Sequence, residues 1–115
     1  IINETKKIVL AENANLADTP FKRIKGLLGR RSLGEGEALI IKPCNSIHTF
    51  FMNFPIDVIF VDKNHKIVKV ISGLQPFRLS SICPVSACVI ELSAGKISPE
   101  SAAVGDILSL GDGSP

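Results

Sequence analysis

The sequence predicts a mainly β protein, either an antiparallel β-sandwich or a partly closed barrel, with one α-helix in its N-terminal half. The first observation behind this prediction is the make-up of the apolar residues. Hydrophobic residues form 45% of the chain, include no Trp or Tyr, and are mostly Ile, Val, Leu and Ala, an enrichment in β-branched residues that favours strands. The second is that about seven short apolar runs are joined by turns and not by crossover helices, which is typical of antiparallel sheets. The third is that only one substantial segment has the apolar spacing of a helix.

The predicted strands follow one another along most of the chain. They are Lys6–Glu12, Ala38–Lys42, Ser46–Met52, Pro55–Asp62, Lys66–Ser72, Ala87–Leu92 and Asp106–Leu110. Asn13–Asp18 has the composition of a turn. Pro55–Asp62 is apolar on both faces, which predicts a central position in its sheet. Asp57 lies inside this run, so its carboxylate needs a hydrogen-bond partner to offset the free-energy cost of burial.

The segment Thr19–Gly29 predicts the helix. Thr19 offers a capping hydroxyl, and Pro20 suits the first helical position because the N–H that it lacks would have no partner there. Apolar residues spaced for one helix face follow at Phe21, Ile24 and Leu28. Gly29 is expected to end the helix as a left-handed cap.

The same helix carries a cluster of basic residues without an acid among them. The cluster consists of Lys22, Arg23, Lys25, Arg30 and Arg31. We interpret it as a solvated face whose last arginines complement the helix dipole. Charge alone could also attract phosphates, so helix 22–31 is the weak exception to the expectation that the protein has no nucleic-acid partner.

Length and composition indicate one domain over residues 1–115, with residues 1–5 and 111–115 expected to be frayed tails. The net charge of +2 is too small to demand a nucleic-acid or membrane partner. No apolar run approaches the length of a membrane span. The three cysteines are an odd number in a chain of a size that does not need disulfides, which favours a reduced, cytoplasmic protein. The sequence does not indicate an oligomeric state.

The cysteines and histidines do not form a recognisable metal or thiol site. Cys44 and His48 are four residues apart, and in a strand their side chains would be about 13 Å apart. Cys83 and Cys88 have the spacing C-x4-C without a second pair, so we predict no metal and no cofactor. A reactive thiol needs a histidine nearby, so we interpret the cysteines as small buried residues.

His48 and Asp57 are the strongest candidates for a functional pair, with Arg30 or Arg78 in support. Both lie in runs that otherwise suit a hydrophobic core, so each needs a polar partner. An Asp–His pair can act as a general base oriented by its carboxylate. It can equally be a buried hydrogen bond that joins two strands, and the sequence leaves both interpretations open.

Several short motifs, in order, resemble the DUF192 (UPF0127) family of small, mostly prokaryotic proteins. They are Gly26–Arg30, Ser32–Leu33, His48–Met52, Pro55–Asp62, Glu91–Gly95 and Gly105–Asp106. Many members have Trp where this chain has Phe51, and a longer acidic-glycine turn where it has Lys63–Lys66. The resemblance implies a compact, jelly-roll-like β-barrel domain, and it implies no activity because the family has none assigned.

Two functions follow as hypotheses. The first is a binding module that recognises a small anionic ligand or a protein partner, because arginine can bind a carboxylate or phosphate with two hydrogen bonds. Its predicted site residues are Arg30, Asn45, His48, Asp57 and Asp106. The alternative is a hydrolytic or thiol-dependent enzyme with His48 as base and Asp57 as the residue that orients it.

Overall fold

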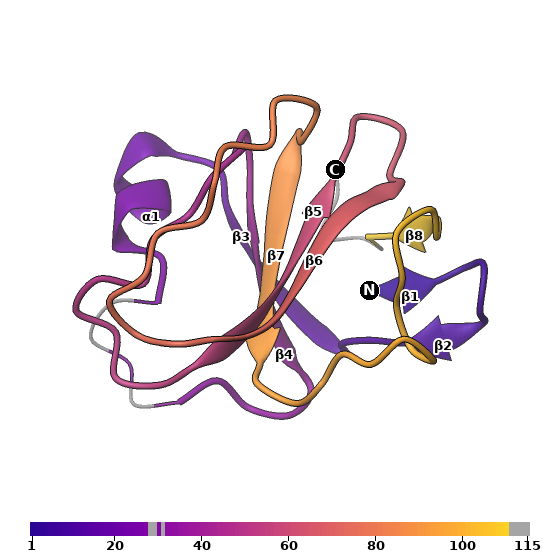
Figure 1. Cartoon of the computed structure of the whole chain (residues 1–115), viewed down its shortest axis with the longest axis horizontal. Coiled ribbons are helices and arrows are strands. Elements are labelled where there is room, and N and C mark those ends of the chain that lie inside the picture. Colours follow the sequence, from indigo (N-terminus) through magenta and orange to yellow (C-terminus); the bar gives the residue numbers. More distant parts are fainter. Residues whose placement is uncertain (28–29, 31, 111–115) are drawn as a thin grey trace.

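Two β-sheets and one short helix make up the fold (Figure 1). The computed structural model describes residues 1–27, 30 and 32–110. Its elements are β1 (Ile2–Asn3), β2 (Ile8–Val9), β3 (Asn13–Ala17), α1 (Pro20–Lys25), β4 (Glu37–Ile41), β5 (Ile56–Val61), β6 (Ile67–Leu74), β7 (Cys88–Ser93) and β8 (Leu108–Ser109). A five-stranded sheet has the order β3-β4-β7-β5-β6, and a three-stranded sheet has the order β2-β1-β8. The prediction of a mainly β protein is therefore confirmed.

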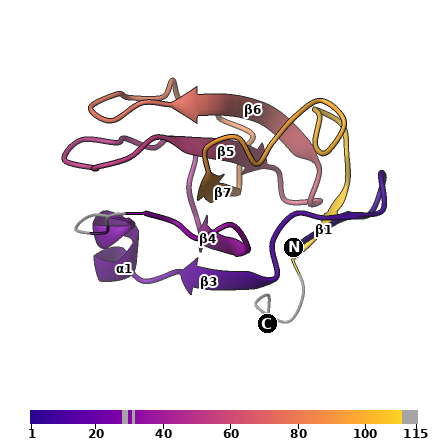
Figure 2. The same ribbon diagram turned by 90° about the horizontal axis from the view of Figure 1, so that it is seen from below.

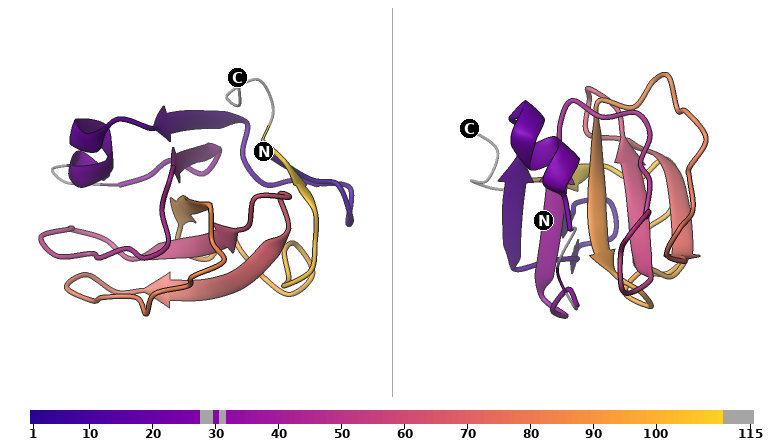
Figure 3. Two further views of the ribbon diagram at one scale, coloured as in Figure 1. Left: turned by 90° about the horizontal axis from the view of Figure 1, so that it is seen from above. Right: turned by 90° about the vertical axis from the view of Figure 1, so that its left-hand side faces the viewer.

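The five-stranded sheet is the centre of the molecule. Its middle strand is β7, with β4 and β3 on one side and β5 and β6 on the other, and the sheet curves (Figure 3). All six residues of β5 are buried, and β5 pairs antiparallel with both β6 and β7. The predicted central strand and its hairpin with the following strand are both confirmed.

Each face of this sheet packs against its own hydrophobic core, because side chains alternate along a strand. On β5, Ile59 and Val61 face a core completed by residues of the N- and C-terminal segments, including Leu10 just after β2 and Leu108 of β8. The opposite face, which carries Val58 and Phe60 of β5, packs against residues of the segments 27–33 and 47–52. In Figure 1, α1 lies at one end of the molecule, and β1, β2 and β8 lie at the other.

The sheet is not wholly antiparallel, because β3 and β4 run parallel with Asn13 opposite Glu37 and Ala17 opposite Ile41. The connection between them contains α1, as a parallel pair requires a crossover. The prediction of a turn at Asn13–Asp18 is wrong for β3. Asparagine favours turns, but Ala14 and Leu16 pack on the sheet core, and pairing with β4 outweighs the local preference.

The helix begins as predicted but is much shorter. The Thr19 hydroxyl accepts a hydrogen bond from the Lys22 N–H at 3.2 Å, and Pro20 occupies the first helical position. The helix ends at Gly26, which has a φ of 47° and donates its N–H to the Lys22 carbonyl. The substantial helix predicted as far as Gly29 is therefore not supported. Leu28, Gly29 and Arg31 lie outside the described residues.

Two other expectations need correction. Ser46–Met52 is not a strand, since it forms only an isolated bridge between His48 and Leu79. Residues 1–5 are not a frayed tail, because β1 pairs with β2 and β8 and Asn3 is fully buried. In the described part of the chain the two sheets share no strand and no closed barrel forms, so the partly closed, jelly-roll-like barrel stays a prediction. The predicted tail 111–115 lies outside the described residues.

No helix among the residues that the structure describes is long and apolar enough to cross a membrane.

Candidate functional site

Asp57 is a structural residue and does not pair with His48. Its side chain is fully buried. Oδ1 accepts a hydrogen bond from the Gly73 N–H at 2.7 Å, and Oδ2 accepts one from the Ile97 N–H at 2.8 Å. On β5 it alternates with Val58, so it lies on the sheet face opposite the core that contains Met52. The predicted His48–Asp57 pair is wrong, because the pleat of β5 directs the carboxylate away from His48.

Asp106 is also remote from His48. It lies just before β8 and accepts hydrogen bonds from Asn3 Nδ2 at 2.8 Å and from the Ala103 N–H at 3.0 Å, and Lys6 Nζ forms an ion pair with it at 3.2 Å. Burial opposes ionisation, but the hydrogen bonds from Asn3, Ala103 and Lys6 outweigh it and lower the pKa of Asp106. The Asp106 carboxylate therefore stabilises the end of the molecule that is opposite α1.

Arg30 is occupied by an ion pair with Glu37 at the start of β4. Its Nη2 lies 3.2 Å from Oε1 and 3.3 Å from Oε2 of that carboxylate. The Gly34 N–H donates to the same carboxylate and, with Arg30, lowers the pKa of Glu37. Asn45 is exposed, and its carbonyl accepts a hydrogen bond from the Cys83 N–H. Among the residues that the structure describes, no hydrogen bond or ion pair joins any two of the five predicted site residues.

A cavity of about 360 Å³ lies beside α1 and includes His48 in its wall. Its apolar walls come from Leu27, Ile41, Ile47 and Met52. Its polar lining includes Arg23, Lys25, Cys44, Ser46, His48 and Glu91. The segments that contribute these residues are α1, the end of β4, the loop before β5, and β7. His48 is the one predicted site residue that lines this cavity.

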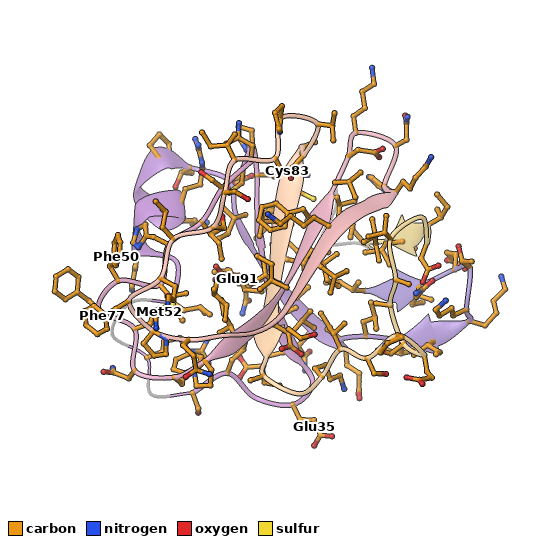
Figure 4. All side chains as sticks on the ribbon, in the orientation of Figure 1. Glu35, Phe50, Met52, Phe77, Cys83 and Glu91 are labelled. Carbon is orange, nitrogen blue, oxygen red and sulfur yellow. The ribbon has the colours of Figure 1, made fainter. Side chains whose placement is uncertain are left out.

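Glu91 is the buried acid of this cavity. It lies on β7, the middle strand of the sheet, with Leu39 and Val58 opposite it on the neighbouring strands. Only 3% of the residue is exposed. Burial raises the pKa of its carboxyl to about 7. Within residues 1–27, 30 and 32–110, no hydrogen bond or ion pair reaches this carboxyl group. Figure 4 shows Glu91 on the sheet, with Met52 nearer the α1 end.

Cys44 and His48 do not form a reactive thiol pair. The Cys44 thiol donates a hydrogen bond to the Ser46 carbonyl at 3.0 Å. Burial raises the pKa of Cys44, and the nearby Glu91 acts in the same direction. His48 is exposed, stacks on Phe50 with ring centroids 5.3 Å apart, and accepts the Phe50 N–H at Nδ1. Its proton in the neutral ring is therefore on Nε2.

Sequence reasoning missed Glu91, although a signal for it was present. The run Ala87–Leu92 is apolar except for Glu91, which is the same pattern that singled out Asp57. Both acids are buried within central strands. They differ in their partners, since backbone N–H groups satisfy Asp57 while the Glu91 carboxyl faces the cavity.

Comparisons with known proteins agree on the family. The profile of the DUF192 family, described as Uncharacterized ACR, matches residues 1–110. A UPF0127 protein of Thermococcus sibiricus is 33% identical over 110 residues, which cover 92% of this chain and 71% of the relative. A UPF0127 protein of Pyrococcus abyssi is 37% identical over 101 residues, with 83% of each chain covered.

The fold is also found in a solved structure. A crystal structure of a protein of unknown function from Novosphingobium aromaticivorans DSM 12444 superposes with a TM-score of 0.74 at 23% identity, covering 82% of this chain and 71% of that one. At this identity the likeness supports the fold alone.

Proposed function

Since the chain belongs to the DUF192 family, whose members have no assigned reaction, we propose from its own geometry that it is a small-ligand-binding domain. The site is the cavity beside α1, and Glu91 is its polar anchor. The observation that carries the proposal is a carboxyl group that is almost wholly buried, faces a cavity and has no hydrogen-bond partner in the described part of the chain.

Burial makes the charged form of this group costly in the folded protein, which is why the pKa of Glu91 is raised to about 7. A ligand that donates a hydrogen bond to the Glu91 carboxylate would stabilise the charged form inside the protein. The stabilisation gained on binding would then offset the cost of burying the charge.

The rest of the cavity limits the kind of ligand. A volume of about 360 Å³ suits a compact molecule. The apolar side chains of Ile41, Ile47 and Met52 would contact its body. Arg23 and Lys25 are exposed and line the same cavity, so they favour an anionic group. The proposed ligand has an amine, amide or hydroxyl donor at one end and a carboxylate or phosphate at the other.

The experiment uses the single methionine of the chain as a probe. Met52 lines the cavity, and its methyl group, labelled with ¹³C, gives one resonance. A library of compact amino and hydroxy acids is added to the wild-type protein. We expect at least one class of compound to shift the Met52 signal in a saturable way. The Glu91→Gln variant should bind these compounds about tenfold more weakly, since a charged hydrogen bond is replaced by a neutral one.

Glu35→Gln is the matched control, because Glu35 is an exposed glutamate away from the cavity (Figure 4). This variant should bind as the wild type does. A Met52 signal that responds to none of the compounds, or responds equally in the Glu91→Gln variant, contradicts the proposal.

The alternative, a hydrolytic or thiol-dependent enzyme, has less support. Asp57 cannot orient His48, because its oxygens are bound to Gly73 and Ile97. The raised pKa of Cys44 keeps its thiol protonated near neutral pH, which lowers its nucleophilicity.

A further inference from the structure

Two loops at the α1 end of the molecule carry phenylalanine side chains into solvent. We call residues 46–54 and 75–81 the tip loops. The first precedes the start of β5 and the second follows the end of β6, and they extend side by side near α1 (Figure 2). Phe51 is 75% exposed and Phe77 is 54% exposed, and their rings meet edge to face with centroids 5.6 Å apart. Phe50 and Leu79 are exposed beside them.

The tip loops hold these rings in a fixed arrangement. Thr49 is fully buried between the loops. Its N–H donates to the Arg78 carbonyl at 2.8 Å, and its carbonyl accepts the Phe77 N–H at 2.8 Å. Its hydroxyl accepts the Arg78 N–H at 2.8 Å and donates to the Gln75 carbonyl at 2.6 Å. One residue therefore joins the two loops with four hydrogen bonds, so the exposed rings are preorganised.

The backbone at the tip suits other residues better than phenylalanine. Phe51 has a φ of 64° and Phe77 a φ of 61°, a left-handed conformation that glycine and asparagine adopt most readily and bulky residues rarely. Each ring is also largely in water, where it gains little from burial. The contact between the two rings offsets only part of these costs, so their exposure indicates a role in contacting a partner.

The charges around the tip loops indicate what the rings would contact. The segments 19–34, 42–56 and 75–83 build this end of the molecule, and they contain lysines and arginines but neither Asp nor Glu. Lys22, Arg23 and Lys25 are exposed on α1, and Arg78 directly follows Phe77. Two acids lie beside these segments, since Glu37 pairs with Arg30 and Asp18 is exposed just before α1. The exposed cations outnumber them, so this end presents an apolar tip beside positive charge, which complements a surface that is negative outside and apolar within.

We propose that the tip loops dock on an anionic lipid bilayer, with Phe51, Phe77 and Leu79 entering the interface. Phenylalanine and leucine side chains are stabilised when they enter the membrane interface, and nearby cations bind anionic headgroups. The proposal does not depend on the ligand cavity. A single-stranded nucleic acid also has negative charge and stacks on aromatic rings. The Phe51 and Phe77 rings contact each other edge to face, and the aliphatic side chain of Leu79 is exposed beside them. Bases stack on open ring faces, whereas lipid chains contact aromatic and aliphatic side chains alike, so the arrangement favours lipid.

The test is co-sedimentation with vesicles of phosphatidylcholine, alone or mixed with phosphatidylglycerol. We expect the protein to bind the mixed vesicles, and to bind them more weakly as salt is added. The Phe51→Asn and Phe77→Asn variants should each weaken binding about tenfold, since each removes a large apolar side chain from the interface. Asparagine tolerates the left-handed backbone, so both variants should stay folded.

Val104→Asn is the matched control, because Val104 is 66% exposed in the turn before β8, away from the tip loops. This variant should bind vesicles as the wild type does. The proposal is overturned if the protein does not sediment with the mixed vesicles, or if both Asn variants of the tip loops bind them unchanged. Retention by a single-stranded oligonucleotide without vesicle binding also overturns it.

Discussion

Replacement of Glu91 by Gln is expected to remove a large part of the pH dependence of stability. Burial raises the pKa of Glu91 from its ordinary value of 4.5 to about 7. The protonated carboxyl is therefore favoured in the folded chain. Its contribution to stability is fully present below pH 4.5 and is lost as the pH rises through about 7. A pKa difference of this size corresponds to about 3 kcal/mol of unfolding free energy.

Urea unfolding of the two proteins at a series of pH values from about 5 to 8 measures this effect. The free energy of unfolding of the wild type, relative to that of Glu91→Gln, should fall by about 2.5 kcal/mol over this range, since part of the effect already occurs below pH 5. The other acids are common to both proteins, so their titration cancels in the difference. Glu35→Gln should run parallel to the wild type. If Glu91→Gln also runs parallel to the wild type, Glu91 ionises as an exposed glutamate does, and burial does not raise its pKa.

The remaining predictions concern residues that hold the fold together. Asp57→Asn should lower the free energy of unfolding by about 3 kcal/mol, because an amide cannot accept from both the Gly73 and Ile97 N–H groups. Ligand binding by the folded variant should not change. A loss of binding without unfolding would contradict this structural role. Asp106→Asn should reduce the loss of stability in acid. A carboxyl with a lowered pKa stabilises the folded protein above its ordinary pKa of 3.8, and this contribution is lost as the pH falls below that value. If the free energy of unfolding in urea falls equally in acid for the variant and the wild type, the prediction is wrong. Thr49→Val should cost about 2 kcal/mol in thermal or urea unfolding because the hydroxyl hydrogen bonds are lost, and an unaltered midpoint would show that they contribute little.

The central strands could be predicted because their sequences depend little on context. β5 and β7 are apolar over nearly their whole length, and such runs suit a strand that is buried on both faces. The start of α1 could be predicted for a similar reason. Thr19 and Pro20 act through local geometry, and the cap forms as expected.

The elements that sequence reasoning placed wrongly are those that depend on distant partners. β3 has the composition of a turn, and only its parallel pairing with β4 makes it a strand. Ser46–Met52 has strand-like alternation, but Thr49 is bound to the loop after β6 and Phe51 adopts a left-handed backbone. Neither interaction can be read from the local sequence.

The candidate site could be predicted only in part. His48 lines the cavity, but the partner predicted for it came from the same stretch of sequence. The phase of the β5 pleat puts Asp57 on the other face of the sheet, whereas Glu91 of β7 faces the cavity. Which of two buried acids has backbone partners is a property of the tertiary structure.

The most direct test of the Glu91 site is a pH titration of its side-chain carboxyl, monitored by ¹³C NMR. The titration is done on the free protein and on the protein with a compound that shifts the Met52 methyl signal. We expect a midpoint near 7 in the free protein. A bound ligand with an amine at Glu91 should lower that midpoint, because a nearby positive charge favours the carboxylate. A midpoint near 4.5 that no cavity ligand moves would contradict the claim that Glu91 is the buried polar anchor of a binding site.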